Sequence, residues 1–392
     1  MPQLPRVNYT TKTKEFFDEE MPQGKMKRVA LDMNGQVQGV HDKDDTNKWA
    51  DGTPVNWSNY LNNGWNCMVQ IPKFYYRAAE GEYGVSENVT RIEISETPVD
   101  GFSIHPAFVR NDKEQAYQYV GAFASSLIGG KYRSLPSKAV AYHNTLYTIK
   151  DDGWKSINTM CSANGYGYRM MDVFHVGMLQ CLMSVEFGDV NAFKKFGGVS
   201  TGGLRTSSGL GSNGHDNYSK ATDSSYIDYR GIESVIGRSG TTIGGMHVSG
   251  TYYVYITGNK DTPNLELGYS SPMANNKLAI PAQGVSNYYC YYDQNKSYRL
   301  TQVGRTGVFV PTTTSNSTIT RSDLYTSSVA ADDVITMGRI GPGCIQPNLT
   351  ENKNCYWGGS VTSNVSMFKF SSGNTYTGSY LHSCVRLCHI YE

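Results

Sequence analysis

The sequence predicts an α+β fold with a mixed antiparallel sheet, two adjacent helices and a long loop-rich insertion. Three observations predict it. Short stretches of alternating apolar residues, typical of strands, come before residue 125 and again after residue 250. Apolar residues at helical spacing lie between these regions, in residues 154–188, and glycine-rich loops follow them. Strands and helices segregated along the chain favour the α+β class, in which the first and last strands can pair.

The strand candidates form an early group and a late group. In the early group Cys67, Val69 and Ile71 alternate, and two more candidates lie in Arg91–Val109 and Tyr117–Phe123. The late candidates are Thr251–Gly258, Asn287–Tyr292, Thr306–Thr312, Ser366–Phe370 and Ser383–Tyr391.

Residues 1–60 are predicted to form a small N-terminal attachment or assembly segment, and residues 61–392 the main domain. The first part is polar and mixed in charge. Its one hairpin candidate has alternating residues on both sides of Asn34-Gly35, a strong short turn signal.

Two helices are predicted between the strand groups. In the first, Ile157, Met160 and Cys161 share one face, and Gly165 is placed to end the helix. In the second, over Val173–Gly188, Asp172 is placed to cap the start. An apolar stripe is expected from Phe174, Met178, Cys181, Leu182 and Val185. His175 borders this stripe, and we expect a hydrogen-bonded histidine at the core edge rather than a metal ligand.

Composition excludes several function classes. Only 18% of residues are charged and the formal net charge is +1, which disfavours nucleic-acid binding. The densest basic run, Lys25–Arg28, is assigned to a solvated face.

No stretch is apolar enough to span a membrane and no signal peptide is seen, so we expect no membrane insertion. The eight cysteines include no C-x-x-C pair, so we expect buried thiols and neither a metal nor a cofactor.

The chain is rich in tyrosine and glycine, with 29 and 41 residues respectively. Tyrosine mixed with Ser, Gly and Asn is typical of recognition loops. A β-rich protein with many turns also uses these residues, and the two interpretations are compatible.

Several stretches, in this order, resemble a group of phage tail-tip and fibre proteins. They are "MVQIPKFYYR", "ISETPVDGFSIHPAF", "YQYVGAFASS", the helix "GYGYRMMDVFHVGMLQCLMSVEFGDVN" and the terminal "YWGGS…FKF…VRL". The resemblance covers about Trp65 to Glu392. It is to the expanded C-type-lectin-like fold, shared by phage receptor-binding proteins of the major tropism determinant class and by the formylglycine-generating enzyme family.

This resemblance implies a phage receptor-binding protein, a tail-tip or fibre adhesin located in the virion and assembled in the host cytoplasm. Its partners would be a host cell-surface receptor, protein or glycan, and other tail proteins met through the N-terminal segment. A homotrimer is implied as well. In relatives diversified by a retroelement, the variable codons lie in the C-terminal segment. In this fold the final strand returns beside the first, and the preceding segment lies on an exposed face.

The resemblance places the receptor-binding residues in this C-terminal segment. Gly358 and Gly359 would turn the chain, with Tyr356 and Trp357 as anchors. The predicted binding residues are Tyr356, Trp357, Ser360, Thr362, Ser363, Asn364, Lys369, Asn374, Tyr376, Tyr380 and His382. Secondary contact candidates are Tyr288, Tyr289, Tyr291 and Tyr292, of which only one alternate pair can face outward in a strand.

Three alternatives to receptor binding remain open. A structural tail or baseplate component would share fold and composition but bury the same face against a neighbour. A calcium-dependent sugar lectin is suggested by Gln346-Pro347-Asn348, although no Trp-Asn-Asp motif follows it. An enzyme like the formylglycine-generating relatives would need Cys384, Cys388 and His389, but the two thiols would be about 13 Å apart along a strand. We therefore predict no catalytic residues. In secreted C-type lectins a last-strand cysteine often pairs with the first helix, which here would join Cys161 to Cys384 or Cys388; for a protein assembled in the host cytoplasm we expect free thiols instead.

Overall fold

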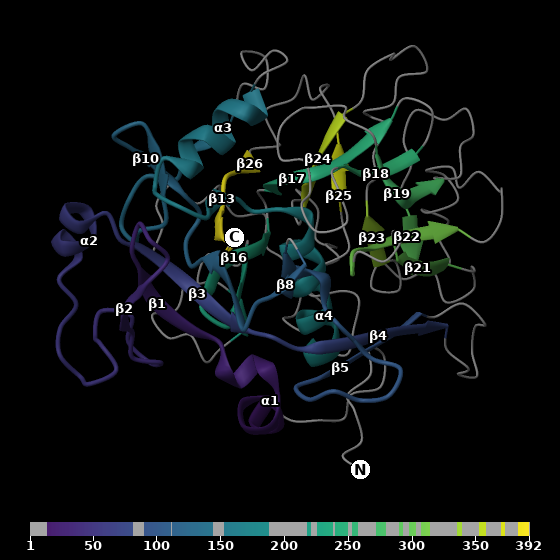
Figure 1. Cartoon of the computed structure of the whole chain (residues 1–392), viewed down its shortest axis with the longest axis horizontal. Helices are drawn as coiled ribbons and strands as arrows, with labels where there is room; N and C mark the ends of the chain where they lie inside the picture. Colours follow the sequence, from purple (N-terminus) through teal and green to yellow (C-terminus); the bar gives the residue numbers. More distant parts are fainter. Residues whose placement is uncertain are drawn as a thin grey trace, which may run out of the picture.

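The chain folds as an α+β protein in a computed structural model (Figure 1). The model describes residues 14–80, 90–110, 112–143, 153–187, 218–220, 226–237, 240–249, 253–257, 272–279, 290–292, 298–302, 307–313, 335–338, 353–357, 370–372 and 383–391. Its α-helices are α1 (Lys14–Glu20), α2 (Trp57–Asn63), α3 (Gly153–Ser162) and α4 (Val173–Phe187). No helix within these ranges is long and apolar enough to cross a membrane.

A six-stranded antiparallel sheet forms the centre, in the order β13-β27-β9-β3-β1-β2. Its strands are β1 (Lys27–Leu31), β2 (Val37–Val40), β3 (Asn66–Pro72), β9 (Tyr117–Gly121), β13 (Tyr168–Met170) and β27 (Leu387–His389). The last strand, β27, pairs with β9 and β13. The expected pairing of the first and last strands is therefore wrong in detail, because β9 and β3 separate β27 from β1 in the same sheet.

The N-terminal hairpin is confirmed, but it is not part of a separate segment. β1 and β2 pair around a turn in which Gly35 has a φ of +77°, a conformation that favours glycine. β1 also pairs with β3, so that Val29 lies opposite Met68. Phe17 of α1 is buried in the main core. Residues 14–60 thus contribute to the same sheet and core as the strands that follow them.

The central sheet has an apolar core on each face. On one face Val29 and Met68 pack in the same cluster as Ile157 and Cys161 of α3. On the other face, side chains such as Val69 belong to the main core, which also contains α4. Alternate residues of a strand point to opposite faces, which explains why β1 and β3 are buried over most of their lengths.

Both predicted helices are confirmed, but the expected single apolar stripe of α4 is wrong. Asp172 caps α4, because its Oδ1 accepts hydrogen bonds from the backbone N–H groups of Phe174 (2.9 Å) and His175 (3.1 Å). Every residue of α4 is buried, including Gln180 and Glu186. A helix buried on all sides needs partners for its polar side chains.

A second sheet joins the chain's C-terminal part to residues 240–279. It comprises β12 (Tyr142–His143), β26 (Ser383–Cys384), β17 (Gly240–Ser249), β18 (Tyr253–Thr257), β19 (Pro272–Ala279), β24 (Lys353–Trp357) and β25 (Phe370–Ser372). β17 is its longest strand and pairs with β18, β24 and β26. In Figure 1 this sheet lies well away from β1 and β2.

Smaller sheets complete the described chain. They are β4 (Tyr75–Glu80), β5 (Thr90–Ser95) and β6 (Ser103–Ile104); β7 (Val109–Arg110) and β8 (Lys113–Glu114); β10 (Ser126–Ile128) and β11 (Lys131–Arg133); β14 (Tyr218–Lys220), β15 (Tyr226–Tyr229) and β16 (Ile232–Gly237); β20 (Cys290–Tyr292) and β23 (Ile335–Gly338); and β21 (Tyr298–Gln302) and β22 (Phe309–Thr313). Two short 3-10 helices, Pro22–Lys25 and Pro106–Phe108, link these elements.

Candidate functional site

The predicted receptor-binding residues lie mostly outside the described residues. Those outside are Ser360, Thr362, Ser363, Asn364, Lys369, Asn374, Tyr376, Tyr380 and His382, with Tyr288 and Tyr289 of the secondary group. Tyr291 and Tyr292 lie in β20, which pairs with β23. Tyr356 and Trp357 form the end of β24.

Trp357 is an anchor and not a contact residue. Its side chain is 1% exposed and belongs to the main core. It lies opposite Thr241 of β17 on one side and Phe370 of β25 on the other. Its inclusion among the receptor contacts is therefore corrected, because a buried indole offers no surface to a partner.

The strand pair β24–β25 determines where the candidate segment begins and ends. Trp357 and Phe370 are paired residues, so the chain enters and leaves residues 358–369 at one end of the same ladder. Ser360, Thr362, Ser363, Asn364 and Lys369 all belong to this connection.

The C-terminal strand β26 lies beside the same ladder. It runs parallel to β17, with Cys384 opposite Thr241, and the Thr241 Oγ1 lies 3.9 Å from the Cys384 Sγ. Thr241 therefore lies between Cys384 and Trp357. This arrangement ties the end of the chain to the base of the candidate segment.

Five cysteines of the described ranges are buried free thiols. They are Cys67, Cys161, Cys181, Cys384 and Cys388. The pairing of Cys161 with Cys384 or Cys388, implied by secreted lectins, is thus not formed. Burial raises the pKa of the Cys67 thiol to about 12 and raises the pKa of Cys388 as well. Such thiols stay protonated and are poor nucleophiles.

A buried polar network lies at the start of α4. The Nη2 of Arg110 donates to both carboxylate oxygens of Asp172, at 2.9 and 3.2 Å. The Nδ1 of His175 lies 2.8 Å from the Asp172 Oδ1, and its Nε2 lies 3.1 Å from the Gln118 Oε1. Burial alone would raise the pKa of Asp172, but Arg110 and His175 hold it well below its usual value. The expectation of a hydrogen-bonded His175 is confirmed, and this fully buried network joins elements rather than meeting a ligand.

A second buried cluster joins α1, α4 and β15. Arg230 forms ion pairs with Glu186 and Asp18, and the Tyr229 hydroxyl donates to the Glu186 Oε2 at 2.8 Å. Arg230 is 1% exposed and Glu186 is also buried. This pairing explains how α4 carries a carboxylate in a fully buried environment.

Arg386 links the last strand to two other elements. Its Nη1 donates to the Gly121 carbonyl and its Nη2 to the Glu233 carbonyl, both at 2.7 Å. Arg386 is 1% exposed, and these bonds to backbone carbonyls accommodate its buried guanidinium.

His389 lies in a buried ring of tyrosines. The rings of Tyr119, Tyr168 and Tyr391 have centroids 5.8, 5.1 and 4.8 Å from its own. Neither ring nitrogen makes a well-formed hydrogen bond within the described part of the chain. Burial lowers the pKa of His389 to about 4, against smaller opposing effects from the Tyr166 backbone and Asp32. His389 is therefore a neutral core residue at pH 7.

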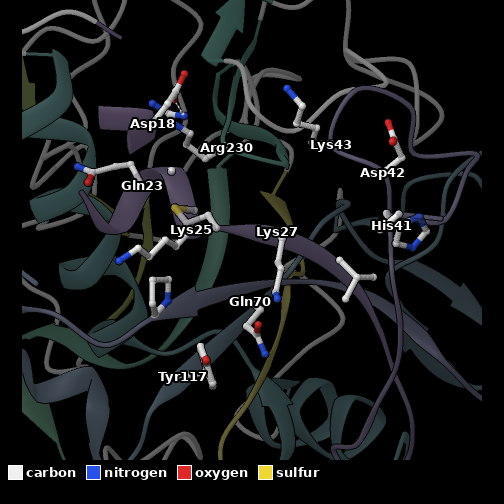
Figure 2. Close-up of a pocket in the computed structure, with 15 residues that line it drawn as sticks. Asp18, Gln23, Lys25, Lys27, His41, Asp42, Lys43, Gln70, Tyr117 and Arg230 are labelled. Carbon is white, nitrogen blue, oxygen red and sulfur yellow. Dashed lines mark hydrogen bonds and ion pairs between the residues drawn. The ribbon is translucent and has the colours of Figure 1, made fainter. Parts of the chain in front are cut away.

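A half-open groove of about 810 Å³ lies beside the start of β1 (Figure 2). Sequence reasoning missed it, because Lys25–Arg28 was assigned to a solvated face. Lys25 and Lys27 are exposed and line the groove, whereas Arg28 is 3% exposed. The Nε of Arg28 donates to the Gly231 carbonyl at 2.8 Å. Lys27 and Arg28, neighbours in β1, thus point to the groove and to the core, as the two faces of a strand require.

No group of three or more His, Cys, Asp or Glu side chains that could hold a metal is found among the described residues. No protein-family model matches the chain, and comparison with curated proteins finds none of significant similarity.

Proposed function

We propose that this chain is a phage receptor-binding protein, a tail-tip or fibre adhesin with an expanded C-type-lectin-like fold. It recognises a host cell-surface receptor through residues 358–369 and the neighbouring C-terminal face. The observation that carries this proposal is the Trp357–Phe370 pair, since both ends of the polar connection are held at one end of a sheet.

The anchoring of that connection supports a recognition role. Trp357 is buried in the core, and Thr241 joins its strand to β26. A polar segment whose base is rigid loses less conformational entropy on binding than a free segment does. Ser, Thr and Asn beside aromatic residues are typical of adaptable recognition surfaces.

The roles of the buried polar groups also support binding over catalysis. Asp172 is bound to Arg110 and His175, and Glu186 is bound to Arg230, all with buried side chains. The free thiols are buried, and burial raises the pKa of Cys67 and Cys388, so that these sulfurs stay protonated. Attachment to other tail proteins through the N-terminal region, a homotrimer and a virion location complete the proposal.

The proposal is tested by replacing Ser360, Thr362, Ser363 and Asn364 together by alanine. The labelled protein is applied to a panel of bacterial isolates, and binding is measured by flow cytometry beside thermal unfolding. A matched control replaces four exposed polar residues of α2, namely Ser58, Asn59, Asn62 and Asn63. We expect unchanged melting of both variants, with cell binding lost only in the first.

Two outcomes would contradict the proposal. Unchanged binding of the 360–364 variant would exclude this segment as the receptor contact. If the wild-type protein binds no isolate but assembles onto other tail proteins through this face, the chain is a structural tail component.

A further inference from the structure

The groove of Figure 2 has a floor made by one face of the central sheet. Lys27 lies opposite Gln70, and Pro72 lies opposite Tyr117. Gln70 and Pro72 are two residues apart in β3, so their side chains point to the same side. Farther along the strands, Val29 and Met68 of this same face are covered within the α3 cluster. The groove is therefore the open end of a sheet face whose other end is core.

The groove holds charges of both signs, and Lys27 is a cation in it that no described residue pairs. Asp18 pairs with Arg230, and Lys25 pairs with Glu96 at 2.6 Å. The Asp42 carboxylate keeps its charge, and its Oδ1 accepts from the backbone N–H groups of Asp44 and Asp45, both at 2.9 Å. Lys27 makes no hydrogen bond or ion pair with any described residue. Lys43 has one contact, with the exposed Asp44 at 3.7 Å. The Lys27 ammonium is thus available to a ligand with an anionic group.

Neutral groups beside Lys27 suit a sugar ring. Figure 2 shows Lys27, Gln70 and Tyr117 following one another along the groove. The Gln70 Nε2 donates to the Tyr119 hydroxyl at 2.8 Å, which fixes the amide, and no described residue donates to its carbonyl oxygen. That oxygen can accept a hydrogen bond from a ligand hydroxyl. Tyr117 is 43% exposed and stands beside Pro72, so the two provide an apolar surface for a ring.

We propose that this groove binds an anionic saccharide, one that carries a carboxylate or a phosphate. Lys27 contacts the acidic group, Gln70 bonds a hydroxyl, and the ring lies on Tyr117. A volume of about 810 Å³ is in the range of small-molecule sites. The groove is formed by β1, β3 and β9, away from β24 and β25, so this inference is independent of whether residues 358–369 bind a receptor.

Saturation-transfer NMR titrations of the full chain test the proposal with three probes. Methyl glucuronide carries a carboxylate, glucose 6-phosphate carries a phosphate, and methyl glucoside is neutral. We expect at least one anionic probe to bind about tenfold or more tightly than methyl glucoside, with an affinity that falls as salt is added. Which anionic probe binds more tightly distinguishes a carboxylated from a phosphorylated ligand.

Lys27→Gln should weaken the binding of the anionic probe by about tenfold, because the substitution removes one charge-assisted hydrogen bond. Tyr117→Ala should weaken binding of the anionic probe without abolishing its salt dependence. Lys131→Gln, at an exposed lysine of β11, is the matched control and should bind as the wild type does. All three positions are exposed, and thermal unfolding confirms that the variants fold. The inference is overturned if no anionic probe binds, if methyl glucoside binds equally well, or if Lys27→Gln leaves the affinity unchanged.

Discussion

Trp357 lies directly opposite Phe370 in the β24–β25 ladder, and its indole is 1% exposed. This pair connects the core to residues 358–369, where most of the proposed receptor contacts lie. Stability and recognition can therefore be separated by mutation, because the anchor is buried while the proposed contacts are polar residues beyond it.

Trp357→Ala should lower the free energy of unfolding by about 3–5 kcal/mol, because it leaves a cavity in the main core. Chemical denaturation monitored by circular dichroism measures the effect. Tyr166→Ala is the control, since Tyr166 is 58% exposed, and its effect should stay within about 0.5 kcal/mol. Equal effects of the two changes would show that Trp357 is not packed in the core.

Leu182→Ala should destabilise the protein by about 2–5 kcal/mol, because Leu182 is fully buried in α4. Leu127→Ala is a matched control at a leucine that is 53% exposed. Urea unfolding distinguishes them. A normal unfolding midpoint for Leu182→Ala would contradict the burial of this helix.

Arg110→Met should cost about 3–5 kcal/mol at pH 7, since it leaves the buried Asp172 carboxylate without its ion-pair partner. The pKa of Asp172 is lowered in the folded state, so its stabilising effect is present above its unfolded pKa of about 3.9 and is lost as the pH falls below it. The difference in free energy of unfolding between Arg110→Met and wild type should therefore become smaller as the pH falls into the acid range. Lys48→Met breaks the exposed pair with Asp45 and should cost at most about 1 kcal/mol. A pH-independent difference would argue against an Arg110–Asp172 ion pair.

Acidification from pH 7 to 5 should destabilise the protein through its buried histidines. The pKa of His389 is about 4 when folded and 6.5 in the unfolded chain, so the unfolded state binds the proton first. Stability is therefore lost as the pH falls through 6.5 toward 4, by about 2 kcal/mol for His389 between pH 7 and 5. Burial also lowers the pKa of His41 to about 4 and that of His105 to about 3, which adds to the loss.

His389→Leu tests that pH dependence. The comparison is between the slopes of unfolding free energy against pH in the variant and in wild type, rather than between their absolute stabilities. The variant should lose less stability than wild type between pH 7 and 5, measured by urea unfolding at each pH. Parallel slopes for the two proteins would mean that the pKa of His389 is the same in the folded and unfolded chains.

Local signals in the sequence were sufficient for several elements. Asn34-Gly35 predicts the β1–β2 turn because a positive φ favours glycine there. Asp172 predicts the start of α4 because a carboxylate can accept from the first free N–H groups. Each signal depends on residues within a few positions, which a sequence displays directly.

Long-range pairing could not be predicted in the same way. Nothing near Lys27–Leu31 indicates that this strand pairs with β3, and nothing near Leu387–His389 indicates β9 as its neighbour. The polar residues of α4 suggested a solvated side, but Glu186 is buried with Arg230, which lies far along the chain. The groove was hidden for the same reason, since Lys27, Gln70 and Tyr117 meet through sheet order alone.

The receptor-binding proposal is tested most directly by site-specific photo-crosslinking on host cells. A benzophenone amino acid replaces Ser363, and in a control protein it replaces Asn59 on the exposed surface of α2. After irradiation on an isolate that binds the protein, crosslinked products are identified by mass spectrometry. We predict a crosslink from position 363 to a host cell-surface molecule and none from position 59. A crosslink from position 363 only to other tail proteins or to a second copy of this chain would contradict receptor binding by this segment.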